Sequence, residues 1–286
     1  MSEYLRHLVR RHVSCGPIVD TALGIRIFLD VDDSSLNRPS VDVFMIPIEL
    51  RPTQVQIDQL HAYLRGIPAK KLGKLSRLKG MDVFERRRSL TVGADYVYSG
   101  LKNTVDIEAE NQMPWLSQFR SHFWPLIGYE LQGQTGGLIN DYASPGPNGE
   151  GGDYISQHSD DESGLSPGTP IFCYTDYSYD TPQTPRATTE SNHRFMTFSR
   201  IGERAESNIL VLATVPGMVY VMNHCQRGYT HGSPLPGKTH RSVSPPCAAG
   251  INRISITERD FLVSGGATKK LKVRGHAAPL YLSTPL

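Results

Sequence analysis

The residues best suited to chemistry lie in one short run, "HSDDE", at positions 158 to 162. On an extended strand, residues two apart point to the same face roughly 6.6 Å apart, so His158 and Asp160 can meet at one ion. Two histidines and one carboxylate on one face of a metal are typical of non-heme iron(II) oxygenases. A His-x-Asp pair also occurs by chance on solvated loops, so the run predicts a metal site only together with further features.

A second feature is the segment "INRISITER" (251–259), whose alternation places Arg253, Ser255, Thr257 and Arg259 on one face and two isoleucines on the other. If the arginine face lies inward, both guanidiniums need anionic partners, because an unpaired buried charge is costly. A small dicarboxylate would supply one through bidentate pairing. The alternative is that the arginines face solvent and the isoleucines face the core, which is the commoner arrangement.

An ordered set of motifs then supports a family resemblance. In chain order these are "LINDY", "HSDDE", "PGTPI", "MN" followed by "CQRGYTHG", and "NRISITER". The set resembles the AlkB-like 2-oxoglutarate- and iron(II)-dependent dioxygenases, and "YVYSG" (96–100) and "MPWL" (113–116) resemble the segments that precede the core in the nucleic-acid repair members. The resemblance covers about residues 50 to 262.

The resemblance implies roles for individual residues. It implies that His158 and Asp160 are metal ligands, that Asn140 and Tyr142 help to hold 2-oxoglutarate, and that Arg253 pairs with its far carboxylate. Arg259 is about 20 Å further along a strand, so it is expected near the metal end. The acids Asp161 and Glu162 match those that meet the target base in this family, although a solvated acidic turn is the alternative.

The sequence also departs from the family pattern. The loop between Tyr142 and His158 is longer and rich in Gly and Pro, Ser255 stands where asparagine is common, and Glu258 replaces the usual phenylalanine. These departures concern the detailed geometry of the cosubstrate pocket.

Three histidines compete for the role of third ligand. His224 directly ends a predicted strand, which makes it the weakest candidate. His231 lies in "QRGYTHG", which resembles the family segment, whereas His240 has the more family-like distance to Arg253. Because "SPLPGK" has the composition of a surface insertion, we place the extra loop after His231 and favour this residue over His240.

A basic stretch precedes the core and includes Arg86, Arg87 and Arg88. Such a stretch can neutralise several phosphates, and Tyr96 and Tyr98 could stack a flipped base. The alternative is a solvated basic loop with structural tyrosines. The whole chain gives no such signal, since it carries 30 basic and 28 acidic residues.

Composition limits the class of protein. The chain has 286 residues, with four dispersed cysteines that fit reduced thiols of an intracellular protein. No run of 18 apolar residues is present, so no transmembrane span is expected. The basic, apolar start "MSEYLRHLVRRHV" leaves organelle targeting open beside a plain surface helix. The expected location is otherwise the nucleus or the cytoplasm.

The elements that must position these residues are mostly strands. "TQVQIDQLHAYLRG" predicts a helix with Thr53 as cap and Gly66 as end, and a second helical pattern follows Pro114. Beyond residue 135, short strand-like runs alternate with Gly, Pro and Ser, which favours a jelly roll. We therefore expect a mainly β fold with flanking helices (α+β) and a double-stranded β-helix core. The expected divisions are an N-terminal extension (1–50), a dioxygenase domain (51–265) and a tail (266–286).

The combined hypothesis is an oxidative demethylase of N-alkylated bases in DNA or RNA. It would use Fe(II), O2 and 2-oxoglutarate, and release formaldehyde, succinate and CO2. The sequence also admits a dioxygenase acting on protein or a small molecule, a zinc metallohydrolase, and an inactive nucleic-acid-binding module. The protein is expected to be a monomer, and no membrane is expected among its partners.

Overall fold

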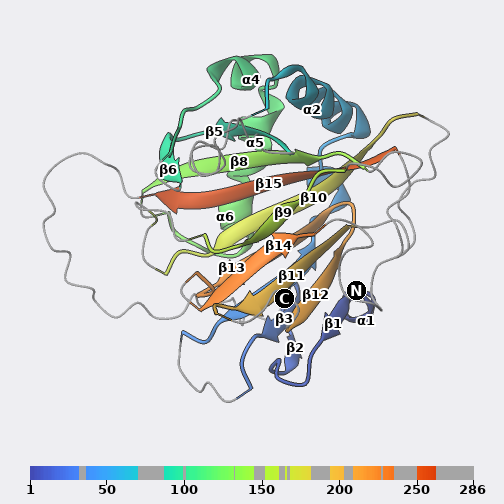
Figure 1. Cartoon of the computed structure of the whole chain (residues 1–286), viewed down its shortest axis with the longest axis vertical. Coiled ribbons are helices and arrows are strands. Elements are labelled where there is room, and N and C mark those ends of the chain that lie inside the picture. Colours follow the sequence, from blue (N-terminus) through green and yellow to red (C-terminus); the bar gives the residue numbers. More distant parts are fainter. Residues whose placement is uncertain are drawn as a thin grey trace, which may run out of the picture.

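The fold is described from a computed structural model. It covers residues 1–31, 37–69, 87–98, 101–131, 133–144, 152–160, 165, 168–181, 194–202, 209–226, 228–234 and 250–261, with the backbone alone for 96–98 and 101–103. Two large antiparallel sheets dominate these residues, one of eight strands and one of five (Figure 1).

The centre of the fold is a double-stranded β-helix, as the sequence predicted. Its strands are β8 (Gln134–Tyr142), β9 (Ile155–His158), β10 (Ile171–Tyr179), β11 (Arg194–Arg200), β12 (Leu210–Thr214), β13 (Met218–Asn223), β14 (Tyr229–Ser233) and β15 (Ile251–Phe261). The larger sheet contains the order β13-β10-β15-β8, and the smaller sheet contains β12-β11-β14-β9. The chain therefore alternates between the two sheets as it proceeds, which is the winding of a jelly roll.

The first part of the chain extends both sheets. In the larger sheet, β2 (Ile18–Asp20), β3 (Gly24–Phe28) and β4 (Ser40–Met45) continue beyond β13, and β5 (Arg88–Val92) borders β8. In the smaller sheet, β1 (Val9–Arg11) pairs with β12. The short strands β6 (Tyr96–Tyr98) and β7 (Leu101–Asn103) pair with each other. The residues expected to form an N-terminal extension thus belong to the same two layers as the core.

Helices cover the outer face of the larger sheet. The predicted helix is present as α2 (Gln54–Gly66), and Thr53 and Gln56 form a capping box at its start. The pattern after Pro114 forms two short helices, α5 (Trp115–Ser121) and α6 (Phe123–Leu126), which follow α4 (Ile107–Gln112). Figure 1 shows α2 and α4 at the β5–β8 end of the sheet. The remaining short elements are α1 (Ser2–His7) and the 3-10 helix η1 (Ile48–Leu50).

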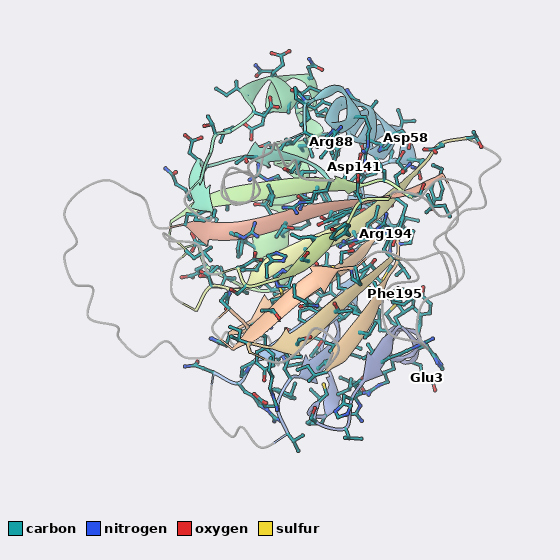
Figure 2. All side chains as sticks on the ribbon, viewed as in Figure 1. Glu3, Asp58, Arg88, Asp141, Arg194 and Phe195 are labelled. Atoms are coloured by element: carbon teal, nitrogen blue, oxygen red, sulfur yellow. The ribbon has the colours of Figure 1, made fainter. Side chains whose placement is uncertain are left out.

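The two faces of the larger sheet pack against different partners. On the outer face, Ile254 and Ile256 of β15 pack with Ile57 and Leu60 of α2 and with aromatic residues of α5 and α6. The other cluster joins residues of the two sheets and of α1, including Leu5, Phe198 and Met218. Figure 2 shows how side chains fill the interior. The space between the sheets is also where Arg253, Ser255, Thr257 and Arg259 of β15 point.

No helix in the described part of the chain combines the length and the apolar character that a membrane crossing needs.

Candidate metal centre and cosubstrate cavity

The smaller sheet brings two histidines together. His158 ends β9, and His231 lies directly opposite it in the antiparallel pairing of β9 with β14. Gly232 allows this close pairing, because a Cβ atom there would lie 3.0 Å from the backbone nitrogen of Gln157 and 3.0 Å from the carbonyl oxygen of Ile155. The extended backbone that the His-x-Asp spacing requires is therefore present at His158, and it comes from pairing with β14.

Asp160 completes a compact cluster with the two histidines. Its Oδ1 lies 3.6 Å from Nε2 of His158, and its Oδ2 lies 3.5 Å from Nε2 of His231. One possible ligand atom from each residue lies within 4.8 Å of the others. Asp160 is 3% exposed and His231 is 8% exposed. Among the residues that the structure describes, these three form the one such group of potential metal ligands.

The electrostatics of the cluster suit a divalent cation. Burial alone would raise the pKa of Asp160, but the charge of Arg259, with smaller effects of the histidines, lowers it below the ordinary value. Burial lowers the pKa of His158, and burial together with His158 lowers the pKa of His231 to about 3. At neutral pH the cluster therefore presents one carboxylate and two uncharged imidazoles, which is the protonation state that a metal requires.

Hydrogen bonding also prepares the cluster. Nδ1 of His158 lies 2.9 Å from the carbonyl oxygen of Ser156, so this nitrogen carries the proton and Nε2 keeps its lone pair toward Asp160. Apart from the ion pair with Arg259, neither oxygen of Asp160 has a hydrogen-bond partner among the described residues. A buried carboxylate with open acceptor sites beside two imidazole nitrogens fits an iron(II) ion.

A cavity extends from this cluster between the sheets. Its walls come from strands of both sheets: Leu138, Asn140 and Tyr142 of β8, Cys173 of β10, Met196 of β11, Tyr220 and Met222 of β13, and Arg253, Ser255, Thr257 and Arg259 of β15. The inward orientation of the arginine face of β15 is thus confirmed. Ser255 lines the cavity directly, so the position at which the sequence departs from asparagine belongs to this wall.

Arg253 is the most buried cation of the cavity wall, at 1% exposure. Its NH2 group donates to Oγ1 of Thr175 at 3.2 Å and lies 3.9 Å from Sγ of Cys173. Its guanidinium carbon lies 5.3 Å from the ring centroid of Tyr142. None of these partners is a carboxylate, and burial raises the pKa of Tyr142, so the phenol stays neutral at neutral pH. Within the described residues Arg253 forms no ion pair with a carboxylate.

Arg259 occupies the opposite end of the wall, as expected. Its NH2 group lies 3.0 Å from Oδ1 of Asp160, so this guanidinium neutralises the carboxylate of the cluster. The two arginines of β15 therefore differ in their partners. Arg259 pairs with a carboxylate of the chain, whereas the contacts of Arg253 are with neutral groups.

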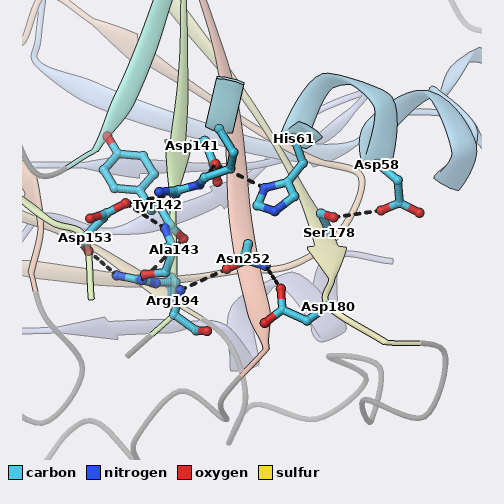
Figure 3. Close-up of polar contacts among 12 residues, drawn as sticks. Asp58, His61, Asp141, Tyr142, Ala143, Asp153, Ser178, Asp180, Arg194 and Asn252 are labelled. Atoms are coloured by element: carbon cyan, nitrogen blue, oxygen red, sulfur yellow. Dashed lines mark hydrogen bonds and ion pairs between the residues drawn. The ribbon is translucent and has the colours of Figure 1, made fainter. Parts of the chain in front are cut away.

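The long loop before His158 returns to the sheet through a polar network (Figure 3). Arg65 of α2 contacts Asp141 at 2.5 Å and Asp153 at 2.9 Å. Asp153 accepts a hydrogen bond from the backbone nitrogen of Ala143 at 3.0 Å, and Arg194 donates to the carbonyl oxygen of Asp153 at 2.6 Å. The network fixes the chain directly before β9. The length of the loop is therefore compatible with a defined position for His158.

Arg87 differs from its predicted surface position. It is 8% exposed, lines the cavity, and donates from Nε to Oδ1 of Asn140 at 2.9 Å. The next residue, Arg88, pairs in register with Asp141. Figure 2 shows Arg88 and Asp141 near the helix-covered end of the sheet. Because Arg87 is buried in the cavity wall, it cannot form one continuous phosphate-binding surface with Arg88.

Several predicted residues lie outside the described part of the chain. These are Asp161, Glu162, Arg86 and the alternative ligand His240, together with the side chains of Tyr96 and Tyr98. The predictions for them remain sequence-based.

Sequence reasoning also missed residues of the cavity wall and a partner of Arg253. Cys173 of β10 and Tyr220 of β13 line the cavity, and Thr175 of β10 accepts a hydrogen bond from Arg253. The alternation in "IFCYTDYSY" puts Cys173 and Thr175 on one face, so the pattern could identify the face. It could not identify Arg253 as the partner, because that depends on the pairing of β10 with β15.

Comparisons with known proteins give distant structural matches. No protein-family model and no curated protein sequence matches this chain. The solved structure "The structure of OsALKBH1" has 13% identity and a TM-score of 0.39, and the match covers 78% of this chain and 98% of that chain. A prolyl hydroxylase from Trichoplax adhaerens, solved with a peptide fragment of a hypoxia inducible factor oxygen degradation domain, has 12% identity and a TM-score of 0.42. This second match covers 77% of this chain and 83% of that chain. Both TM-scores are low, so the fold assignment rests on the strand order of this chain.

Proposed function

We propose that this protein is an Fe(II)- and 2-oxoglutarate-dependent dioxygenase. The observation that carries the proposal is the layout of one cavity. A cluster of His158, Asp160 and His231 stands at one end, and Arg253, whose partners among the described residues are neutral, lies on the wall that β15 provides. A metal with three protein ligands keeps positions open for further ligands, and a buried guanidinium with neutral neighbours favours an anion.

His158, Asp160 and His231 would hold the iron. Bound iron(II) supplies the activation of dioxygen for oxidation of a C–H bond. Arg259 holds Asp160 in its ionised form, and the carbonyl oxygen of Ser156 fixes the tautomer of His158. Arg253 would pair with the far carboxylate of 2-oxoglutarate. Asn140 and Tyr142 line the same cavity and would contact the cosubstrate.

The finer proposal is oxidative demethylation of an N-alkylated base in DNA or RNA, and the motif resemblance supports it. 2-Oxoglutarate loses CO2 and takes one oxygen atom of dioxygen to become succinate. The other oxygen atom enters a C–H bond of the N-methyl group. The resulting N-hydroxymethyl group releases formaldehyde and leaves an N–H. The electrons lost in decarboxylation and in oxidation of the methyl carbon together reduce dioxygen, so the reaction balances without a further reductant.

The test begins without oxygen and then adds it. Fe(II) and 2-oxoglutarate binding are measured anaerobically by calorimetry. Oxygen and methylated oligonucleotides are then added, and succinate, formaldehyde and the product base are measured by mass spectrometry. Iron-dependent 2-oxoglutarate binding with stoichiometric succinate is expected. Turnover that is independent of 2-oxoglutarate would instead indicate a metallohydrolase, and succinate formation only with a peptide or small molecule would reassign the substrate.

The same assay decides the third ligand. His231→Ala should abolish turnover and sharply weaken iron binding, because it removes one of three protein ligands. The matched variant His240→Ala should keep both within several-fold, since a loop histidine does not complete the cluster. The opposite pattern would transfer the role of ligand to His240.

A further inference from the structure

Arg87 contacts the proposed cosubstrate site through a directional hydrogen bond to Asn140. Its Nε donates to Oδ1 of Asn140 at 2.9 Å, and both residues are buried in the cavity wall. Asn140 lies on β8, and Arg87 directly precedes β5, the strand that pairs with β8. The contact therefore joins two neighbouring strands at the wall of the cavity.

This hydrogen bond determines which way the amide of Asn140 faces. A guanidinium offers only donors, so the amide oxygen must turn toward Arg87, because the reversed amide would set its NH2 group against another donor. The NH2 group of Asn140 is then held away from Arg87. A carboxylate or a keto group offers only acceptor oxygens, so a fixed amide donor is complementary to a 2-oxo acid.

Arg87 also acts on the cavity through its charge. Burial raises the pKa of Tyr142, and the positive charge of Arg87 opposes that shift. Tyr142 and Arg87 both line the cavity.

We infer that Arg87 is a positioning residue for the cosubstrate, which orients the amide of Asn140 so that its NH2 group donates to an oxygen of the bound 2-oxo acid. The inference rests on the proposed function. Nothing in the sequence motifs assigned this role, since Arg87 was expected on a phosphate-binding surface. The structure gives it a place in the cavity, where it acts through Asn140.

A double-mutant cycle separates this role from a direct or a purely structural one. The probe is 2-oxoglutarate titrated calorimetrically into Mn(II)-loaded protein without oxygen. Arg87→Met should weaken 2-oxoglutarate binding about tenfold, which is the typical worth of one well-oriented hydrogen bond. In an Asn140→Ala background the same change should cost less than about twofold, because the group that Arg87 orients has gone.

Arg87→Lys distinguishes orientation from charge. Lysine keeps the positive charge but lacks the planar Nε–H, so the 2-oxoglutarate affinity of Arg87→Lys should resemble that of Arg87→Met. Because an ammonium can also donate to Asn140, the two variants are compared again in the Asn140→Ala background. If lysine there raises the affinity above that of methionine, the charge acts without Asn140, and the inference is overturned. Thermal unfolding midpoints are measured for each variant, and if Arg87→Met does not fold, the cycle is completed with Arg87→Lys.

The outcomes also separate the inference from the proposed function. Losses that add in the double variant would overturn the role of Arg87 alone, since the wild-type protein would still bind 2-oxoglutarate. A wild-type protein that binds Mn(II) but not 2-oxoglutarate would overturn the proposed function, and the role of Arg87 with it.

Discussion

The two faces of β15 each bury an arginine, and the two arginines have different partners. On the helix-covered face, Arg120 of α5 forms a bidentate pair with Glu258, in which NH2 of Arg120 donates to Oε2 of Glu258 at 3.2 Å. On the cavity face, Arg253 contacts a hydroxyl, a thiol and an aromatic ring. Arg120 is 6% exposed and Arg253 is 1% exposed, so burial does not explain the difference.

The fold itself supplies a carboxylate to neutralise Arg120, whereas a bound ligand would have to supply one for Arg253. Removing a guanidinium from water is costly, and a carboxylate in good geometry offsets much of the cost. Glu258 provides this for Arg120, and burial raises the pKa of Glu258 even though Arg120 opposes the shift. Arg253 has only neutral neighbours among the described residues. We therefore expect Arg120 to matter for stability and Arg253 to matter for binding.

The largest expected effect is the loss of cosubstrate binding in Arg253→Met. Losing a buried charge-assisted bidentate pair costs roughly 3 to 5 kcal/mol, so 2-oxoglutarate affinity should fall by about two orders of magnitude or more. The ligand-free variant should be at least as stable as wild type, because the change removes a buried charge. Calorimetric titration and urea unfolding measure the two quantities on the same protein.

Two outcomes would contradict this interpretation of Arg253. Near-unchanged affinity and succinate formation would remove it from the binding site. A large loss of stability in the ligand-free state would make it a structural arginine like Arg120, and the comparison between the two faces would fail.

The next largest effect is expected in Glu258→Gln, which should lose stability but keep 2-oxoglutarate binding. Glutamine keeps the shape of Glu258 but leaves Arg120 with only the longer ion pair to Glu110, at 3.4 Å, so the free energy of unfolding should fall by up to roughly 3 to 5 kcal/mol. Affinity for 2-oxoglutarate should stay within about threefold of wild type, because Glu258 points away from the cavity. A threefold change in affinity corresponds to less than about 1 kcal/mol of binding free energy. Urea unfolding monitored by circular dichroism tests the first expectation. A stability within experimental error of wild type would show that the pair contributes nothing.

Local patterns were sufficient to predict much of this fold. The capping residue Thr53 and the apolar spacing that follows it predicted α2, and the alternation in "INRISITER" predicted which side chains of β15 share a face. That the arginine face lines the cavity is seen only in the fold. Both signals act over a few residues, so they can be read from the sequence. The jelly roll followed from several short strands without intervening helices.

Residues whose roles depend on pairing between distant segments could not be predicted in the same way. The sequence marked Glu258 only as a departure from the family pattern, and it gave no sign that Arg120, on another element, is its partner. Arg87 was placed on the surface because its neighbours are basic. Its burial follows from the pairing of β5 with β8, which is a tertiary contact and leaves no local signal.

The smallest expected effect comes from removing both charges on the helix-covered face, in Arg120→Met with Glu258→Met. Removing Glu258 alone leaves Arg120 with only the ion pair to Glu110, whereas joint removal leaves neither charge of the Arg120–Glu258 pair. The free energy of unfolding of the double variant should therefore lie within about 1 kcal/mol of the wild-type value or above it. Space around the pair is tight, because a Cβ atom at Gly137 would lie 2.7 Å from Oε1 of Glu258. Methionine suits such a site, since its flexible side chain can adapt to irregular space.

The contrary result would be that the two single replacements each lower the free energy of unfolding as much as Glu258→Gln does, and that their losses add in the double variant. Packing around Gly137, and not charge compensation, would then explain the stability of this face. The same replacement has no counterpart at Arg253, which has no carboxylate partner among the residues that the structure describes, and this asymmetry is the physical basis for assigning its partner to a ligand.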